Sequence, residues 1–263
     1  MKIAFVGDSF CDDIAPDNFT KIVVNISWPH LVAKQYNAEI ICKGRGGTAL
    51  FHAYEDLLEI VNKADYIIFC ITAFSRLPNR YGIPIDAKWL TEISWSMKKL
   101  MANVPQDLDY HNNREPTDWH HKKAIKAGEL YYNDLISFEF HQVAQKGILM
   151  QMDELMIEKK KKCIWFPCFE NELSMQEYIP KSGPMASHPL YIISNAEKSS
   201  DGQIVDEERY PNGVLKSEGP DDRRNHLNEE HNKKMAELII NIINKDDFTP
   251  KMIKMKDYFK VLR

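Results

Sequence analysis

Short apolar segments alternate along the chain with longer segments in which apolar residues recur at helical spacing. The short runs predict buried strands at residues 2–6, 38–42, 65–71 and 162–167, with a weaker candidate at 190–194. The longer segments predict helices at residues 27–36, 49–63, 85–102 and 119–159, the last as one or two helices, and a terminal helix after Asn228. Strands that alternate with helices are typical of a parallel sheet covered on both faces.

We therefore predict one α/β domain over residues 1–263, a three-layer α/β/α sandwich with a mostly parallel, flavodoxin-like central sheet. With 263 residues, 44% of them hydrophobic, the chain is long enough to bury such a core. Residues 85–160 are predicted to form a helical insertion. It is either a lid that controls access to the carboxyl edge of the sheet or a structural cap or oligomerisation surface.

The first predicted strand ends abruptly in Gly7-Asp8-Ser9. This turn brings the hydroxyl of Ser9 to the carboxyl end of a strand, where open α/β sheets bind their ligands. A serine hydroxyl becomes a useful nucleophile only beside a base. His226 lies in the loop directly before the terminal helix, whereas His231 falls inside that helix, so His226 is predicted to be the base.

These motifs resemble the SGNH (GDSL-like) hydrolase superfamily, in the same order along the chain. Gly7-Asp8-Ser9-Phe10 is similar to its nucleophile block, and the segment 44–48 is similar to the block whose glycine amide lines the oxyanion hole. His226-Leu227-Asn228 is similar to the last block, which supplies the histidine. The resemblance implies that Ser9 attacks an acyl carbon, that His226 carries the proton, and that the amides of Ser9 and Gly46 stabilise the oxyanion.

The last block of the family usually has an aspartate three residues before the histidine, but Arg223 stands there in this chain. Asp222 lies one residue further back, with Asp221 behind it, and Asp222 is our choice for the carboxylate that orients His226. The alternative is a serine–histidine dyad in which a backbone carbonyl holds the imidazole.

The family's Gly-x-Asn-Asp block is missing after the strand predicted at residues 65–71. Asn79, Ser75 and Arg76 are candidates for the side chain that completes the oxyanion hole, and we select Asn79. The resemblance implies a serine hydrolase that cleaves an ester with a small acyl group, such as an O-acetyl group on a carbohydrate, or transfers that group to another hydroxyl. The alternative is an inactive member of the family that serves as a binding or assembly module.

Composition narrows the partners that we expect. The net charge is −4, and no basic cluster indicates nucleic-acid binding. No segment is apolar enough to span a bilayer and no signal peptide is visible, so we predict a cytoplasmic protein without a membrane partner. A small-molecule or carbohydrate ester is the expected substrate, and a homo-oligomer is left open.

We predict no cofactor and no metal site. His111, His120, His121 and Asp118 lack a paired ligand motif, so they are interpreted as surface residues. The five cysteines are interpreted as reduced thiols, most of them within predicted strands.

Overall fold

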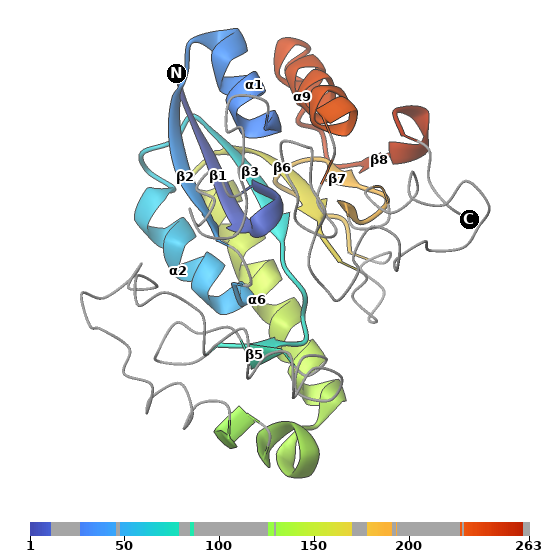
Figure 1. Ribbon diagram of the computed structural model, residues 1–263. Coiled ribbons are helices and arrows are strands. Elements are labelled where there is room, and N and C mark those ends of the chain that lie inside the picture. The colour runs from blue at the N-terminus through green and yellow to red at the C-terminus, as the bar shows by residue number, and fades with distance from the viewer. Residues whose placement is uncertain are drawn as a thin grey trace, which may run out of the picture.

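The structure is a computed structural model that describes residues 1–11, 27–45, 48–78, 85–86, 126–128, 130–169, 178–190, 193, 227 and 229–259 (Figure 1). Its elements are, in order, β1 (Lys2–Asp8), η1 (Ser9–Cys11), α1 (Trp28–Tyr36), β2 (Glu39–Arg45), α2 (Leu50–Ile60), β3 (Tyr66–Ile71), β4 (Arg76–Leu77), β5 (Ile85–Asp86), η3 (Tyr131–Leu135), α6 (Phe138–Glu158), β6 (Lys162–Pro167), β7 (Met185–Ala186), α9 (Glu229–Asn244), β8 (Met252–Ile253) and η6 (Met255–Asp257).

The described residues contain a six-stranded sheet in the order β2-β1-β3-β6-β7-β8, in which every neighbouring pair is parallel. From β1 the chain first adds β2 on one side and then crosses to β3 on the other. The carboxyl ends of β1 and β3 therefore flank the point where the winding direction changes, which is where open α/β sheets bind ligands. The predicted α/β class with a parallel sheet is confirmed.

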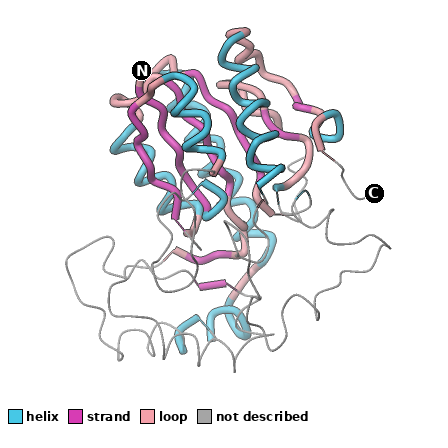
Figure 2. The backbone as a smooth tube through the Cα atoms, turned by 45° about the horizontal axis from the view of Figure 1, so that its top comes forward, coloured by secondary structure: helices cyan, strands magenta, loops and turns pink. Residues whose placement is uncertain are grey.

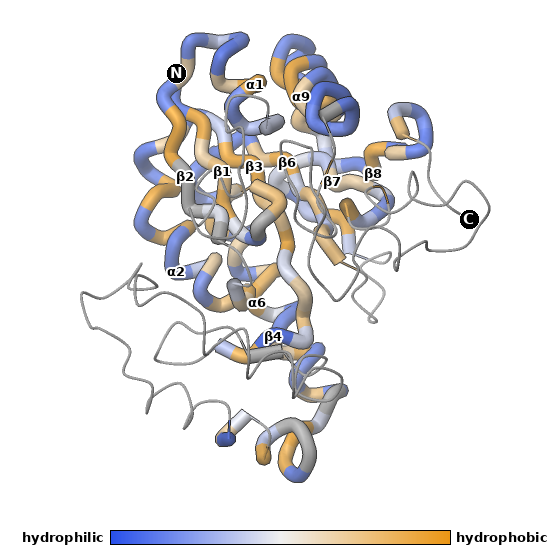
Figure 3. Tube along the Cα trace, viewed as in Figure 1, coloured by the Kyte–Doolittle hydropathy of each residue, from blue (hydrophilic) through white to orange (hydrophobic). Residues whose placement is uncertain are grey.

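Helices cover both faces of this sheet. Helices α1 and α9 pack together on one face, and α2 and α6 pack together on the other (Figures 1 and 2). The residues of β1 alternate between the two sides: Ile3 and Phe5 belong to the core under α1 and α9, and Ala4 and Val6 to the core under α2 and α6. This burial on both faces explains the continuous apolar run from which β1 was predicted, and Figure 3 shows such apolar stretches along the inner strands.

The predicted strands at 2–6, 38–42, 65–71 and 162–167 are confirmed as β1, β2, β3 and β6, but the weaker strand at 190–194 is wrong. Leu190 and Ile193 are helical, and the N–H of Ile193 donates to the carbonyl of Pro189 at 3.4 Å. Both side chains are fully buried at a helical spacing of three. A short apolar run fits a buried helix as well as a buried strand, and here the helix forms just after a proline.

The helices predicted in the middle of the chain are only partly confirmed. Ile85–Asp86 form β5, which pairs antiparallel with β4, so the predicted helix 85–102 is wrong at its start. Its remaining residues lie outside the described part of the chain. The segment predicted at 119–159 contains the π-helical η3 and then α6, which begins after Ser137, whose hydroxyl accepts the N–H of Phe140 at 3.3 Å.

Helix α6 connects β3 to β6, and its second half belongs to the helical layer. Leu149, Met152 and Met156 are fully buried in the core under α2 and α6. Farther toward its start, Phe140 and Val143 are 71% and 65% exposed. The lid predicted for residues 85–160 stays a prediction, because residues 87–125 lie outside the described part. Among the described helices, none has both the length and the apolarity to cross a membrane.

Candidate active site

Strand β1 carries Ser9 to the carboxyl edge of the sheet. It ends at Asp8, and Ser9 is the first residue of η1; the description covers the backbone of Ser9 but not its side chain. Gly7 has φ 113°, and a Cβ atom built on it would lie 2.0 Å from the carbonyl oxygen of Cys70 in β3. Residues with a side chain rarely adopt this φ, so the turn that presents Ser9 depends on glycine at position 7.

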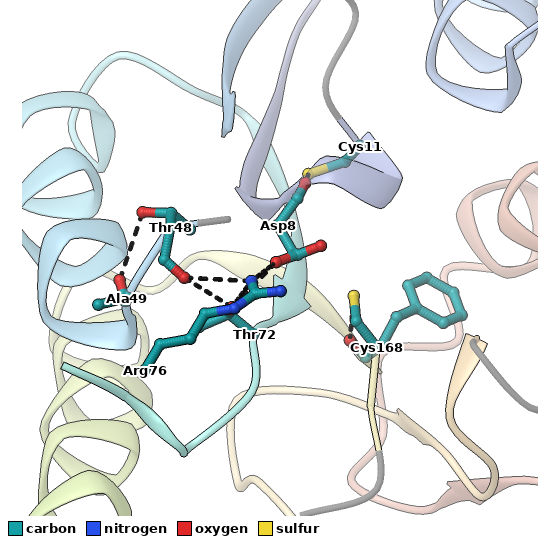
Figure 4. A network of polar contacts seen from close by, with 8 residues as sticks. Asp8, Cys11, Thr48, Ala49, Thr72, Arg76 and Cys168 are labelled. Carbon is teal, nitrogen blue, oxygen red and sulfur yellow. Dashed lines mark hydrogen bonds and ion pairs between the residues drawn. The ribbon is translucent and has the colours of Figure 1, made fainter. Parts of the chain in front are cut away.

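Asp8 is the centre of a buried polar cluster directly before Ser9 (Figure 4). Its side chain is fully buried, and Arg76 Nη1 donates to Asp8 Oδ2 in an ion pair. Arg76 Nη1 also donates to the hydroxyl oxygen of Thr72 at 2.6 Å. Because Asp8 ends β1, Thr72 follows β3 and Arg76 begins β4, the cluster ties together the chain segments around the carboxyl ends of the two central strands.

The same cluster holds the segment between β2 and α2. The Thr72 hydroxyl lies 2.7 Å from the carbonyl oxygen of Thr48 and 2.9 Å from Asp8 Oδ2, and its single proton serves one of them at a time. Arg76 Nη1 is 3.4 Å from the Thr48 carbonyl oxygen. In the β1–β2 register, Asp8 is paired with Arg45. The chain therefore leaves β2 beside the end of β1 and returns at Thr48 within the cluster.

The position of Arg76 gives it a structural role that the sequence prediction missed. Arg76 was one of three candidates for the oxyanion hole. The residue is only 6% exposed, however, and its guanidinium pairs with Asp8. The guanidinium carbon also lies 4.8 Å from the centroid of the Phe169 ring, in a cation–π contact. Arg76 thus neutralises the buried carboxylate of Asp8, the residue before Ser9. Without this partner, the buried charge would be costly.

His141 of α6 fixes the turn between β3 and β4 from the other side. Its Nε2 atom lies 2.5 Å from the carbonyl oxygen of Phe74, so this nitrogen carries a proton and donates it. Burial lowers the pKa of His141, an effect that the bond to Phe74 partly opposes. The turn after β3 is thus held through the backbone carbonyl of Phe74.

Three buried thiols lie beside the cluster. Cys11 Sγ donates to the backbone carbonyl of Asp8 at 3.2 Å, and Cys70 interacts with both Cys11 and Cys168. Burial raises the pKa of Cys70 and raises that of Cys168 to about 12. Cys70 and Cys168 therefore remain protonated near neutral pH, so they are packing groups rather than nucleophiles.

The residue that follows His226 is linked through hydrogen bonds to the residue that follows Ser9. Leu227 is 3% exposed, and its carbonyl accepts a hydrogen bond from Asn232 Nδ2 at 2.9 Å. Asn232 Oδ1 accepts the backbone N–H of Trp28 at 2.9 Å, and Trp28 Nε1 donates to the carbonyl of Phe10 at 2.8 Å. A chain of hydrogen bonds therefore connects the chain neighbours of the predicted nucleophile and the predicted base.

Most of the residues that were predicted for the site lie outside the described part of the chain: Gly46, Asn79, Asp221, Asp222 and His226. The histidines and the aspartate first considered as metal ligands, His111, His120, His121 and Asp118, lie outside it as well. His231 is described, and it lies within α9, as predicted. It is 1% exposed and packs edge-on against the Phe259 ring at a centroid distance of 5.4 Å. Among the described residues, no group of three or more His, Cys, Asp or Glu side chains is arranged to hold a metal ion.

Sequence analysis missed four residues that build this site: Asp8, Thr48, Thr72 and Asn232. Of these, Thr72 carried a usable signal, because it directly follows the buried strand β3 at the edge where ligands bind. Polar groups at such an edge often face the neighbouring strand ends. Asn232 carried no local signal, since its partner Trp28 is 204 positions away along the chain.

The fold and the polar cluster define an α/β protein with a candidate site at the switch point of its sheet. No protein-family model and no curated protein matches the chain. Two solved structures are similar to it, each with 12% sequence identity. One, from Desulfitobacterium hafniense, is described as a lipolytic protein of the G-D-S-L family, the family that the motifs resemble; the match covers 92% of this chain and 98% of that one at a TM-score of 0.32.

The other structure is described as an acetyl xylan esterase, and the match covers 100% of this chain and 92% of that one at a TM-score of 0.34. Similarity at this level does not assign the chain to a family.

Proposed function

We propose that this protein is a serine ester hydrolase in which Ser9 is the nucleophile, His226 the general base and Asp222 the carboxylate that orients the imidazole. The observation that carries the proposal is the hydrogen-bonded chain from Phe10 through Trp28 and Asn232 to Leu227. It links segments from opposite ends of the sequence, each next to a residue that a serine hydrolase needs. Without such a link, a lone serine after a strand would carry little weight.

In the proposed reaction, Ser9 Oγ attacks the acyl carbon of the ester while His226 accepts the hydroxyl proton. The tetrahedral intermediate expels the alcohol, which takes that proton from His226. A water molecule then attacks the acyl-enzyme, again with His226 as base, and releases the carboxylic acid and free Ser9. No cofactor enters these steps.

The oxyanion is stabilised, in this proposal, by the backbone amides of Ser9 and Gly46 and by the side chain of Asn79. Each such donor contributes about 3–4 kcal/mol in the transition state. The β1–β2 register supports a shared role for the amides of Ser9 and Gly46. Asp8 pairs with Arg45, and Ser9 and Gly46 are the next residues of the two strands' chain segments. Glycine at position 46 leaves the amide open to close approach.

The proposal is tested by fluorophosphonate labelling of the purified full-length protein. The probe phosphonylates an activated serine, so we expect one adduct per chain, and peptide mass spectrometry is expected to locate it on Ser9. Labelling is expected to be abolished by heat denaturation before the probe is added. A folded protein that does not react, or that carries the adduct on another serine, would contradict the proposal.

We further propose a small acyl group on a polar carrier such as a carbohydrate as the substrate. The proposal is supported by the polar character of described groups around the end of β1, Thr48, Thr72 and Arg76. With p-nitrophenyl esters of increasing acyl length, we expect kcat/KM to be highest for acetate and to fall for longer chains. Faster turnover of octanoate than of acetate would show that the acyl site is long and apolar.

A second candidate function is a binding or assembly module without catalysis. It is favoured by the exposed apolar side chains of η3 and the start of α6, where Leu135 is 74% and Phe140 71% exposed. Apolar groups of this size that gather on a surface often mark an interaction site. Absence of labelling in a folded protein would favour this candidate.

A further inference from the structure

We infer that Asn232 is a positioning residue that sets where His226 stands relative to Ser9, an inference that rests on the proposed function. Asn232 lies in α9 and is 6% exposed. Its amide bridges two backbone groups of other segments, the N–H of Trp28 and the carbonyl of Leu227, each at 2.9 Å. Through the second of these bonds Asn232 acts on the backbone next to His226.

The chemistry of the two partners determines how the amide is oriented. A backbone N–H can only donate and a backbone carbonyl can only accept, so Oδ1 faces Trp28 and Nδ2 faces Leu227. A flipped amide would lose both bonds. Asparagine is therefore required here for one acceptor and one donor at once.

The anchor on the other side of Asn232 is rigid. The Trp28 side chain is 1% exposed and packs edge-on against Phe5 of β1, with ring centroids 5.4 Å apart. Its Nε1 donates to the carbonyl of Phe10 at 2.8 Å, directly after Ser9. Asn232 thus connects Leu227 to the backbone of the residue whose side chain also fixes Phe10, so that both segments are tied to Trp28.

Asn232 also satisfies the first N–H of α1 from a different helix. Trp28 begins α1, and the hydroxyl of the preceding Ser27 lies 3.1 Å from His30 Nδ1 rather than on the helix N–H groups. Asn232, rather than the hydroxyl of Ser27, therefore accepts this N–H. A replacement of Asn232 must therefore keep an acceptor for Trp28, or the packing of α1 on α9 will change as well.

One peptide unit separates Leu227 from His226, so a displacement of the Leu227 carbonyl moves the imidazole by a similar amount. A misplacement of about 1 Å can cost about a hundredfold in rate. Loss of the bond to Leu227 is therefore expected to affect the chemical step more than substrate binding.

Asn232→Asp separates the two bonds. The carboxylate can still accept the N–H of Trp28, because the N-terminus of a helix favours negative charge. It cannot donate to the carbonyl of Leu227, and it repels that oxygen. We expect kcat to fall by about tenfold to a hundredfold, with KM changed much less, when rates are normalised to active sites titrated with a fluorophosphonate. Asn241→Asp is the matched control, because it makes the same charge change at an exposed position of α9 and should leave kcat unchanged.

The outcomes are distinguishable. If the wild-type protein neither hydrolyses esters nor is labelled, the proposed function is wrong and the role of Asn232 falls with it. If the wild type is active and Asn232→Asp has the same kcat per active site, or loses only the fraction of folded protein, the inference alone is overturned. Should Asn232→Asp not fold, Asn232→Ala removes both bonds without burying a charge, and a fall in kcat at least as large is expected. An unchanged kcat per active site would contradict the inference.

Discussion

Ser9→Ala is expected to lower kcat for p-nitrophenyl acetate by about a million-fold, and His226→Ala by a similar factor. The hydroxyl and the imidazole act as one unit, because the base is useful only with a nucleophile to deprotonate and the hydroxyl is a poor nucleophile without the base. The double variant should therefore be no slower than either single variant. The measurement is kcat at saturating ester, with circular dichroism to verify folding.

A control for this experiment is Ser137→Ala, which makes the same chemical change at an exposed serine that caps α6. Loss of a cap costs about 1 kcal/mol of stability, so the control should lower the melting temperature and leave kcat as it is. Multiplicative effects of the two catalytic replacements, or an active Ser9→Ala protein, would show that Ser9 and His226 do not act together.

Asp222→Ala decides between the triad and the dyad. In a triad, the carboxylate holds the imidazole in the correct tautomer, and its loss is expected to lower kcat by about ten-thousandfold. In a dyad, a backbone carbonyl orients the imidazole instead, and the kcat of Asp222→Ala should stay close to the wild-type value. Asp221→Ala serves as the comparison, since it removes the carboxylate next to Asp222 in the sequence.

Much of the fold was predictable because it is encoded locally. The strands β1, β3 and β6 are buried on both faces, which produces apolar runs that need no partner to be recognised. Helix α9 was predictable for the same reason: Met235, Leu238 and Ile239 recur at helical spacing and are all buried. The strands β7 and β8 at one side of the sheet have only two residues each and left no periodicity to detect.

The candidate site was less predictable because its contacts join distant positions. Ser9 lies at the end of a strand whose pattern is clear, so its place at the sheet edge could be predicted. The Asp8–Arg76 pair joins residues 68 positions apart, and a charged residue after a strand gives no sign of whether it will be buried. The bridge from Trp28 to Asn232 depends on two helices packing against each other, which local patterns do not specify.

Arg76→Met is expected to lower the free energy of unfolding by about 3–5 kcal/mol, because it leaves the buried carboxylate of Asp8 without its counter-charge. Methionine keeps much of the side-chain volume, so packing is disturbed less than charge. The measurement is urea-induced unfolding at neutral pH. The control is Lys2→Met, which removes an exposed pair with Glu39 between β1 and β2 and should cost less than about 1 kcal/mol.

Asp8→Asn combined with Arg76→Met tests whether charge pairing is the cause. Removing both charges eliminates the desolvation cost as well as the attraction, so the double variant should recover most of the stability lost in Arg76→Met. Additive losses would mean that Arg76 stabilises the protein through its contacts with Thr72, Thr48 and Phe169 rather than through Asp8. If the double variant recovers its stability but reacts with the fluorophosphonate more slowly than the wild type, the ion pair also fixes the backbone that presents Ser9.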